Sequence, residues 1–270
     1  MSSTSISVAA RETRDRRIPF SVVRDTFAIT QRNLIGYRRV PQLLVFSTIQ
    51  PVVFVLMFRF VFGGAINIPG PISYVDYLMP GIFVQTVVFG AIATSIGLAS
   101  DLKSGLMERF HSLPMARSAV LTGRTVADLL RNVFVVILMM SVGFLVGWRP
   151  TGALAVVAGA LLVLLFGYAM SWIFATVGLA VGDPETAQAA AFPVLAPLVF
   201  ASSAFVSVDS MPGWLQVFAR HQPVSVTASA MRALVNGQPA GSLVLQSVAW
   251  CVGILLVFAP IAVRLYRRAV

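Results

Sequence analysis

Few side chains in this sequence could carry out catalysis or bind a metal. The two histidines are His111 and His221, and the single cysteine, Cys251, lies in a long apolar run. A metal site or a Cys/His pair needs such groups close together, whereas the topology derived below separates the histidines onto opposite membrane faces. The sequence contains neither His-Glu-x-x-His nor Gly-x-Ser-x-Gly, which argues against the common membrane-protease and lipase motifs. We interpret Cys251 as a small apolar packing residue.

The single lysine argues against a nucleotide site. A phosphate-binding loop needs a lysine preceded by glycine, and Lys103 follows Leu102. If the protein performs work, a partner must therefore bind the nucleotide, or an ion gradient must supply the energy. We expect no cofactor and no metal in this chain.

Asp128 is the carboxylate expected to lie deepest in a membrane. Arg124 precedes it by four residues and Arg131 follows it by three, so one helix face carries all three. Gradient-driven carriers use ionisable groups near the bilayer midplane, whereas this group is expected at the cytoplasmic entrance to the third span. We interpret it as a structural ion-pair cluster, with no charged group at the midplane; a role in ion coupling is the alternative.

The composition indicates which elements must position these residues. Of 270 residues, 57% are hydrophobic and only 11% are charged, and the mean hydropathy is +0.85. A soluble domain carries about 25% charged residues, so this chain has too few polar groups to cover a water-soluble globule. An integral membrane protein is predicted.

Six runs without charged residues, some extended through flanking polar residues, are long enough to span a bilayer core of about 30 Å as helices. They lack the alternation typical of membrane β-barrels. We predict an all-α integral membrane protein with one transmembrane domain, residues 19–270. The predicted spans are residues 41–62, 76–100, 124–148, 152–181, 186–207 and 242–264.

The basic residues predict the orientation of the spans. Eight arginines precede the first span, four basic residues lie between spans two and three, and three arginines follow the last span. Because cytoplasmic loops are enriched in Lys and Arg, both termini are predicted to be cytoplasmic. Residues 1–18 are expected to form a disordered cytoplasmic tail.

Residues 19–39 are predicted to form a helix lying on the inner leaflet. Asp25, Arg32 and Arg39 lie opposite an apolar stripe, a pattern typical of interfacial helices. The stripe consists of Phe20, Val23, Phe27, Leu34 and Tyr37. A flexible basic tail attracted to anionic lipid is the alternative.

Residues 105–113 are predicted to form a short amphipathic helix between spans two and three. Leu106, Phe110 and Leu113 form its apolar stripe, and Pro114 ends it. A helix of two turns is not stable in water unless it packs against something. It either docks in a groove of another protein or lies on the headgroups or on its own bundle.

Residues 209–236 are predicted to lie outside the membrane before span six. Two short apolar stripes, one containing Trp214 and Phe218, are separated at His221, Gln222 and Pro223. Each is too short to span a bilayer. They either re-enter the outer leaflet or cap the bundle.

These segments together resemble the permease subunits of type-2 ABC exporters, in particular the daunorubicin-resistance-like branch of actinobacteria. The stretch "MERFHSLPMARSAVLTGR" is similar to the Glu-Arg…Leu-Pro-x-x-Arg loop of that family, and "HQPVS" is similar to the drug-resistance-like branch, in which Gln222 replaces an asparagine. The resemblance implies that residues 105–113 are a coupling helix seated in a cleft of the ATPase. The residues that match the family motif are Glu108, Arg109, Leu113, Pro114 and Arg117. With Phe110 of the apolar stripe, they are the predicted coupling residues.

The resemblance also implies the partners and the location. Two copies of a separate ATPase would bind ATP and Mg, and a second permease copy or a sister permease would complete a dimer in the plasma membrane. The cargo would be an amphipathic, drug-like or lipid-like compound, and no nucleic acid would be bound. An ATP-independent carrier and a membrane-embedded lipid-modifying enzyme are the alternatives. Arginine outnumbers lysine nineteen to one, which suits a GC-rich, actinobacterial genome.

Overall fold

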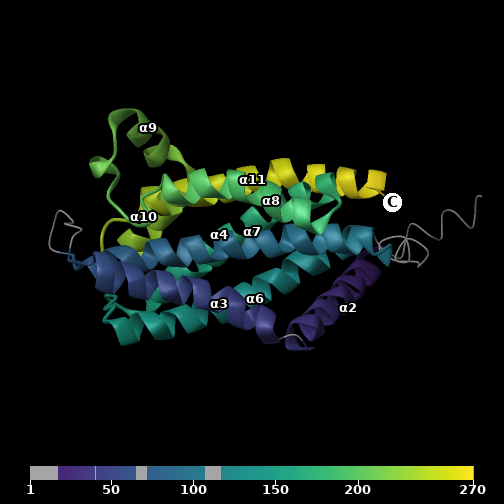
Figure 1. The fold of residues 1–270 in the computed structure, drawn as a ribbon, viewed down its shortest axis with the longest axis horizontal. Coiled ribbons are helices and arrows are strands. Elements are labelled where there is room, and N and C mark those ends of the chain that lie inside the picture. Colours follow the sequence, from purple (N-terminus) through teal and green to yellow (C-terminus); the bar gives the residue numbers. More distant parts are fainter. Residues whose placement is uncertain (1–17, 40, 65–71, 107–116, 270) are drawn as a thin grey trace, which may run out of the picture.

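The computed structural model describes residues 18–39, 41–64, 72–106 and 117–269. All regular structure in these ranges is helical (Figure 1), which confirms the all-α prediction. The longer helices are α2 (Ile18–Arg39), α3 (Pro41–Leu56), α4 (Tyr74–Lys103), α6 (Arg117–Val146), α7 (Ala153–Val181), α8 (Pro184–Phe200), α10 (Pro223–Val235) and α11 (Gly241–Ala269). The shorter ones are the π-helical turn η1 (Met57–Phe62), the 3-10 turn η2 (Val208–Ser210) and α9 (Gly213–His221).

Four helices among the described residues are long and apolar enough to cross a membrane: Tyr74–Lys103, Leu121–Val146, Ala153–Val181 and Gly241–Arg268. A shorter apolar helix covers Thr48–Val61, and α8 has 17 residues. The outward surface of the long helices carries large apolar side chains, as expected for a surface in contact with lipid rather than water.

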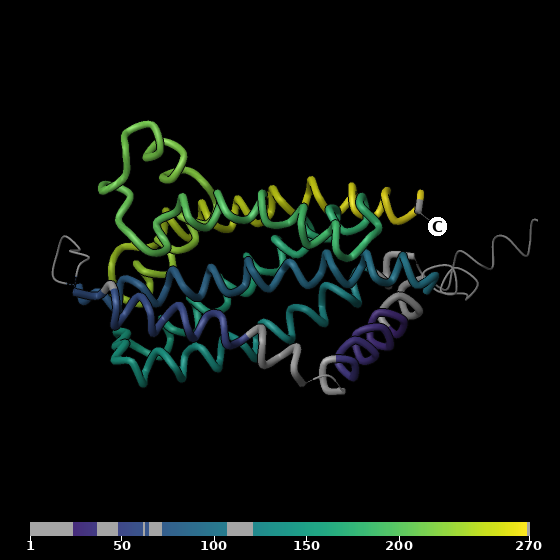
Figure 2. The backbone as a smooth tube through the Cα atoms, in the orientation of Figure 1, coloured from purple at the N-terminus to yellow at the C-terminus, as the bar shows by residue number. Residues whose placement is uncertain are grey.

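Helix α4 is the centre of the bundle. It packs against α7 most extensively and also against α6, α8 and α10, and 67% of its most apolar stretch is buried, compared with 17% for α11. Figure 2 shows α4 running antiparallel to α3 and α6 along the long axis of the molecule. Most of the surface of α4 therefore packs on neighbouring helices, whereas α11 is peripheral.

The two ends of the bundle differ. In Figure 1, α2 and the C-terminal end of α11 lie at one end, and α9 and α10 lie at the other. Helix α2 runs obliquely to the long helices and packs against α6. Both ends of the described chain thus gather on one side.

Two helices have bounds that differ from those of the predicted spans by seven residues. Helix α6 begins at Arg117, seven residues before the predicted start, and α8 ends at Phe200, seven residues before the predicted end at 207. Helix α8 ends early because the backbone after it is hydrogen-bonded to α10 instead. Ser203 N donates to Ser225 Oγ at 2.9 Å. A Cβ on Gly81 of α4 would overlap the backbone of Ala204, so this turn packs directly on a glycine.

Candidate functional site

The predicted ion-pair residues lie together between α4 and α6. Arg124 Nε is 3.9 Å from Asp128 Oδ2, and Arg131 Nη1 is 3.7 Å from Asp128 Oδ1. Thr94 of α4 donates its hydroxyl hydrogen to Asp128 Oδ2 at 2.5 Å. The Asp128 side chain is fully buried, so these neighbours compensate its charge out of contact with water.

The cluster continues toward the end of the bundle where α2 lies. Asp101 Oδ2 is 3.4 Å from Arg124 Nη1 and 3.5 Å from Arg32 Nη2, which joins α2, α4 and α6. A Cβ on Gly97 would overlap the Arg124 guanidinium, so α4 needs a glycine there to let that side chain pass. We call this group the polar seam; it consists of Arg32, Thr94, Asp101, Arg124, Asp128 and Arg131.

At one end, the polar seam reaches the middle of α6. Arg131 lies 14 residues after the first residue of α6 and 15 before the last, and its Nη2 donates to the Gly90 carbonyl of α4 at 2.6 Å. The Arg131 guanidinium therefore lies beside the middle of both α4 and α6. The expected place of the Arg124, Asp128 and Arg131 cluster, at the cytoplasmic entrance to the third span, stays a prediction.

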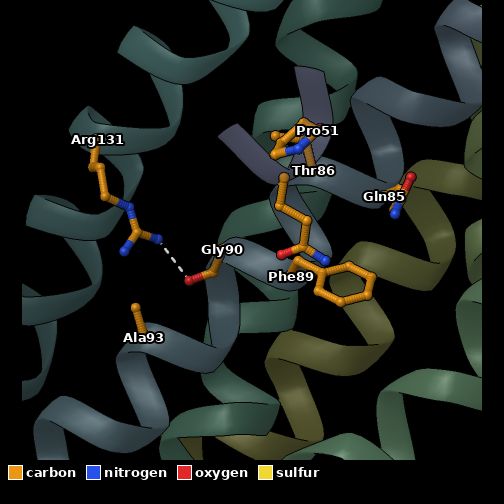
Figure 3. Close-up of a pocket in the computed structure, with 8 residues that line it drawn as sticks. Pro51, Gln85, Thr86, Phe89, Gly90, Ala93 and Arg131 are labelled. Carbon is orange, nitrogen blue, oxygen red and sulfur yellow. Dashed lines mark hydrogen bonds between the residues drawn. The ribbon is translucent and has the colours of Figure 1, made fainter. Parts of the chain in front are cut away.

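A pocket of about 90 Å³ lies beside Arg131, between α3, α4 and α6. Its walls include Gln50 and Pro51 of α3 and Gln85, Thr86 and Phe89 of α4. Figure 3 shows the Arg131 guanidinium directed at Gly90, with Pro51, Thr86 and Phe89 grouped on the other side of Gly90. Gln85 was not among the predicted site residues, although it is a polar residue in the middle of a long apolar run.

The residues assigned to coupling cannot be placed. Glu108, Arg109, Phe110, Leu113 and Pro114 lie outside the described residues, as does the side chain of Arg117, the first residue of α6.

Next to that segment, an ion pair joins the end of α4 to the start of α8. Lys103 Nζ lies 2.7 Å from Asp183 Oδ1. This hydrogen bond, together with those from the backbone amide and hydroxyl of Thr186, lowers the pKa of the Asp183 carboxyl to about 2. Because the pKa of the Asp183 carboxyl is lower in the folded protein than its ordinary value of 3.8, the ion pair stabilises the fold above pH 3.8. This stabilisation is lost as the pH falls toward 2. The pair is therefore ionised at physiological pH.

Helix α2 presents a polar face to the bundle. Asp25, Ile29 and Thr30 are buried, and the Thr30 hydroxyl donates to the Gly123 carbonyl at 3.1 Å. Of the predicted apolar stripe, Phe27 is 68% exposed and faces outward, and Leu34 is partly buried. The side chains of Phe20, Val23 and Tyr37 lie outside the described residues.

The segment before α11 divides into an exposed part and a buried part. Trp214, Phe218 and His221 of α9 are exposed, whereas Gln222 is buried. Gln222 Nε2 donates to the Leu198 carbonyl at 2.9 Å, and its Oε1 accepts from Val224 N at 3.2 Å. Gln222 thus closes the end of α8 and caps α10, whose first residue is Pro223.

Sequence reasoning missed Arg232, which fixes the same region. Its guanidinium stacks over the Tyr77 ring at 3.7 Å and donates to the carbonyls of Tyr77 (3.0 Å) and Ser203 (2.9 Å). This buried cation therefore joins α10 to α4 and to the chain after α8. In the part of the chain that the structure describes, no group of three or more His, Cys, Asp or Glu side chains could hold a metal.

Comparison with known proteins gives the same assignment as the resemblance. Residues 24–236 match the ABC-2 type transporter family. The chain is 36% identical to the daunorubicin resistance ABC transporter permease protein DrrB1 of Streptomyces coeruleorubidus, over 88% of this chain and 84% of that protein. It is 28% identical to a probable doxorubicin resistance ABC transporter permease protein, DrrC, of Mycobacterium tuberculosis, over 92% and 90% of the two chains.

A helical bundle with long apolar helices, matched over this much of its length, identifies an integral membrane permease. The chain belongs to the ABC-2 type transporter family.

Proposed function

We propose that this chain is the transmembrane subunit of an ATP-driven exporter that moves an amphipathic, drug-like or lipid-like compound out of the cytoplasm or the inner leaflet. The observation that carries the proposal is the 36% identity, across most of both chains, to a permease named for daunorubicin resistance. An ATP-independent carrier would not explain the family match, and a lipid-modifying enzyme would need an acid/base pair facing the membrane.

Transport should therefore require ATP. Inside-out vesicles containing the chain and its ATPase subunit should accumulate daunorubicin with ATP and Mg, measured by quenching of its fluorescence. Vesicles in which the ATPase carries a replaced phosphate-loop lysine are the control and should accumulate none. Accumulation that persists without ATP and collapses when a proton gradient is removed would favour the carrier instead.

The proposed arrangement has six spans: α3 with η1, α4, α6, α7, α8 and α11. Two observations support it. Helix α3 continues into η1 over residues 41–62, and α2 and the end of α11 lie at the same end of the bundle (Figure 1). With the arginine asymmetry, this favours cytoplasmic termini in the plasma membrane.

This topology predicts which residues react with an impermeant thiol reagent in intact cells. In a Cys251→Ala background, cysteine at Ser104 or Thr186 should stay unlabelled, and cysteine at Gln238 should be labelled. All three native residues are exposed, so the difference would report the side of the membrane rather than burial. Labelling of all three after permeabilisation is the control, and labelling of position 104 in intact cells would contradict the topology.

The proposed assembly contains a second permease, the same chain or a sister, and two ATPase copies that bind ATP and Mg. Glu108, Arg109, Phe110, Leu113, Pro114 and Arg117 are the proposed coupling residues. The Lys103–Asp183 ion pair supports this assignment, because it braces the end of α4 directly before the coupling segment.

A further inference from the structure

The pocket between α3, α4 and α6 contains an acceptor that the protein does not satisfy. Gln85 is 2% exposed, and its Oε1 accepts no hydrogen bond from any residue within the described ranges. A buried acceptor left without a donor costs free energy, and such atoms in proteins are almost always paired. Gln85 is one of the residues that line the pocket; its oxygen is closed to solvent in this structure, so a rotation of the side chain is needed to bring it to a group that enters there.

The charge in the pocket is already engaged by the protein. Arg131 Nη2 donates to the Gly90 carbonyl at 2.6 Å and to Asn132 Oδ1 at 3.4 Å, and Nη1 lies 3.7 Å from Asp128. An anion would compete with these bonds. Among the described residues, the buried group of the pocket that remains without a hydrogen bond is Gln85 Oε1, and an uncharged donor can bind to it.

The walls and the size of the pocket restrict what can enter. Phe89 and Pro51 are apolar walls, and the Thr86 hydroxyl already donates to the Ile82 carbonyl. The volume of about 90 Å³ is well below the roughly 300–1,000 Å³ of a site for a whole drug-sized ligand. Only one edge of such a molecule fits, and the exposed Gln50 marks where the remainder would leave the pocket.

We propose that this pocket is a subsite for the hydroxyl-bearing, uncharged edge of an amphipathic cargo molecule. Gln85 Oε1 accepts a hydrogen bond from the cargo hydroxyl, and Phe89 and Pro51 contact the flat apolar surface beside it. The apolar body of the cargo stays outside the pocket, along α3. The proposal rests on the proposed exporter function and adds the chemical group by which cargo is recognised.

Gln85→Leu tests the proposal in the complex of the chain with its ATPase, reconstituted in lipid nanodiscs. Daunorubicin, which is fluorescent and carries hydroxyl groups, is one probe, and tetramethylrhodamine methyl ester, which has no hydrogen-bond donor, is the other. Loss of one neutral hydrogen bond should weaken daunorubicin binding about three- to tenfold and leave binding of the rhodamine within about twofold. Gln85→Glu keeps an acceptor and should retain daunorubicin binding.

Ser95→Ala is the matched control. Ser95 is also fully buried on α4, with a hydroxyl that bonds to none of the described residues, and it does not line the pocket. This variant should bind both probes as the wild type does. Because Gln85→Leu removes an unsatisfied group, its melting temperature should not fall, so weaker binding would not reflect misfolding.

Two outcomes would overturn the subsite. One is equal daunorubicin affinity of the wild type and Gln85→Leu; the other is a wild type that shows no saturable daunorubicin binding. Failure of the exporter function would be distinguishable, because it would appear as loss of ATP-dependent transport in every variant while the Gln85-dependent binding difference remained.

Discussion

Replacing Phe110 and Leu113 together by alanine is expected to separate the permease from its ATPase. If both side chains are buried in a groove of the ATPase, each contributes about 1.5–3 kcal/mol, so the double variant should lose roughly 3–6 kcal/mol of docking free energy. This corresponds to a hundredfold or larger decrease in affinity. The variant should insert normally in the membrane but fail to co-purify with the ATPase, or keep it and lose cargo-stimulated ATP hydrolysis.

Three single variants refine this prediction. Ser112→Ala, on the predicted opposite face, is the control and should co-purify normally. Glu108→Gln removes a rim charge and should weaken coupling more than assembly. Pro114→Ala should let the helix continue and change the direction of its apolar stripe. Normal transport by the Phe110/Leu113 double variant, with the ATPase still bound, would refute the coupling-helix assignment.

Replacing Asp128 by alanine is expected to destabilise the permease itself. The carboxylate is fully buried between Arg124 and Arg131. Arg124 keeps its ion pair with Asp101 when Asp128 is removed, but the buried Arg131 guanidinium loses the carboxylate that lies 3.7 Å from it. Removing one partner of a buried ion pair costs about 3–5 kcal/mol. The purified variant should melt at a markedly lower temperature, or should fail to accumulate in the membrane.

Asp209→Ala is the matched control for this experiment. Asp209 pairs with Arg220 at 2.8 Å, but both side chains are exposed, and exposed pairs contribute about 0–1 kcal/mol. If repulsion between buried guanidinium groups is the cause, adding Arg131→Gln to Asp128→Ala should restore part of the stability. Equal melting temperatures for Asp128→Ala and the wild type would contradict the structural role.

The sequence alone determined the class of protein, because hydropathy and charge act on each residue independently of its partners. A long run without charged residues predicts a membrane helix whatever other helices lie beside it. The apolar helices and the permease family were therefore predicted correctly. The spacing of Arg124, Asp128 and Arg131 also predicted their proximity, since residues three and four apart on a helix are neighbours.

Only the tertiary structure decided what these residues contact on the neighbouring helices. Arg131 reaches the Gly90 carbonyl, and Arg124 passes over Gly97, because α4 and α6 are antiparallel in one particular register. Likewise, α8 ends at Phe200 because the chain around its end is bonded to the region of α10. Ser203 N donates to Ser225 of α10, and Gln222, directly before α10, donates to the Leu198 carbonyl of α8, each across about twenty residues of chain. Such contacts depend on the relative translation and rotation of whole helices. Periodicity within one helix carries no information about either quantity, which is why Gln85 and its pocket emerged only from the packed bundle.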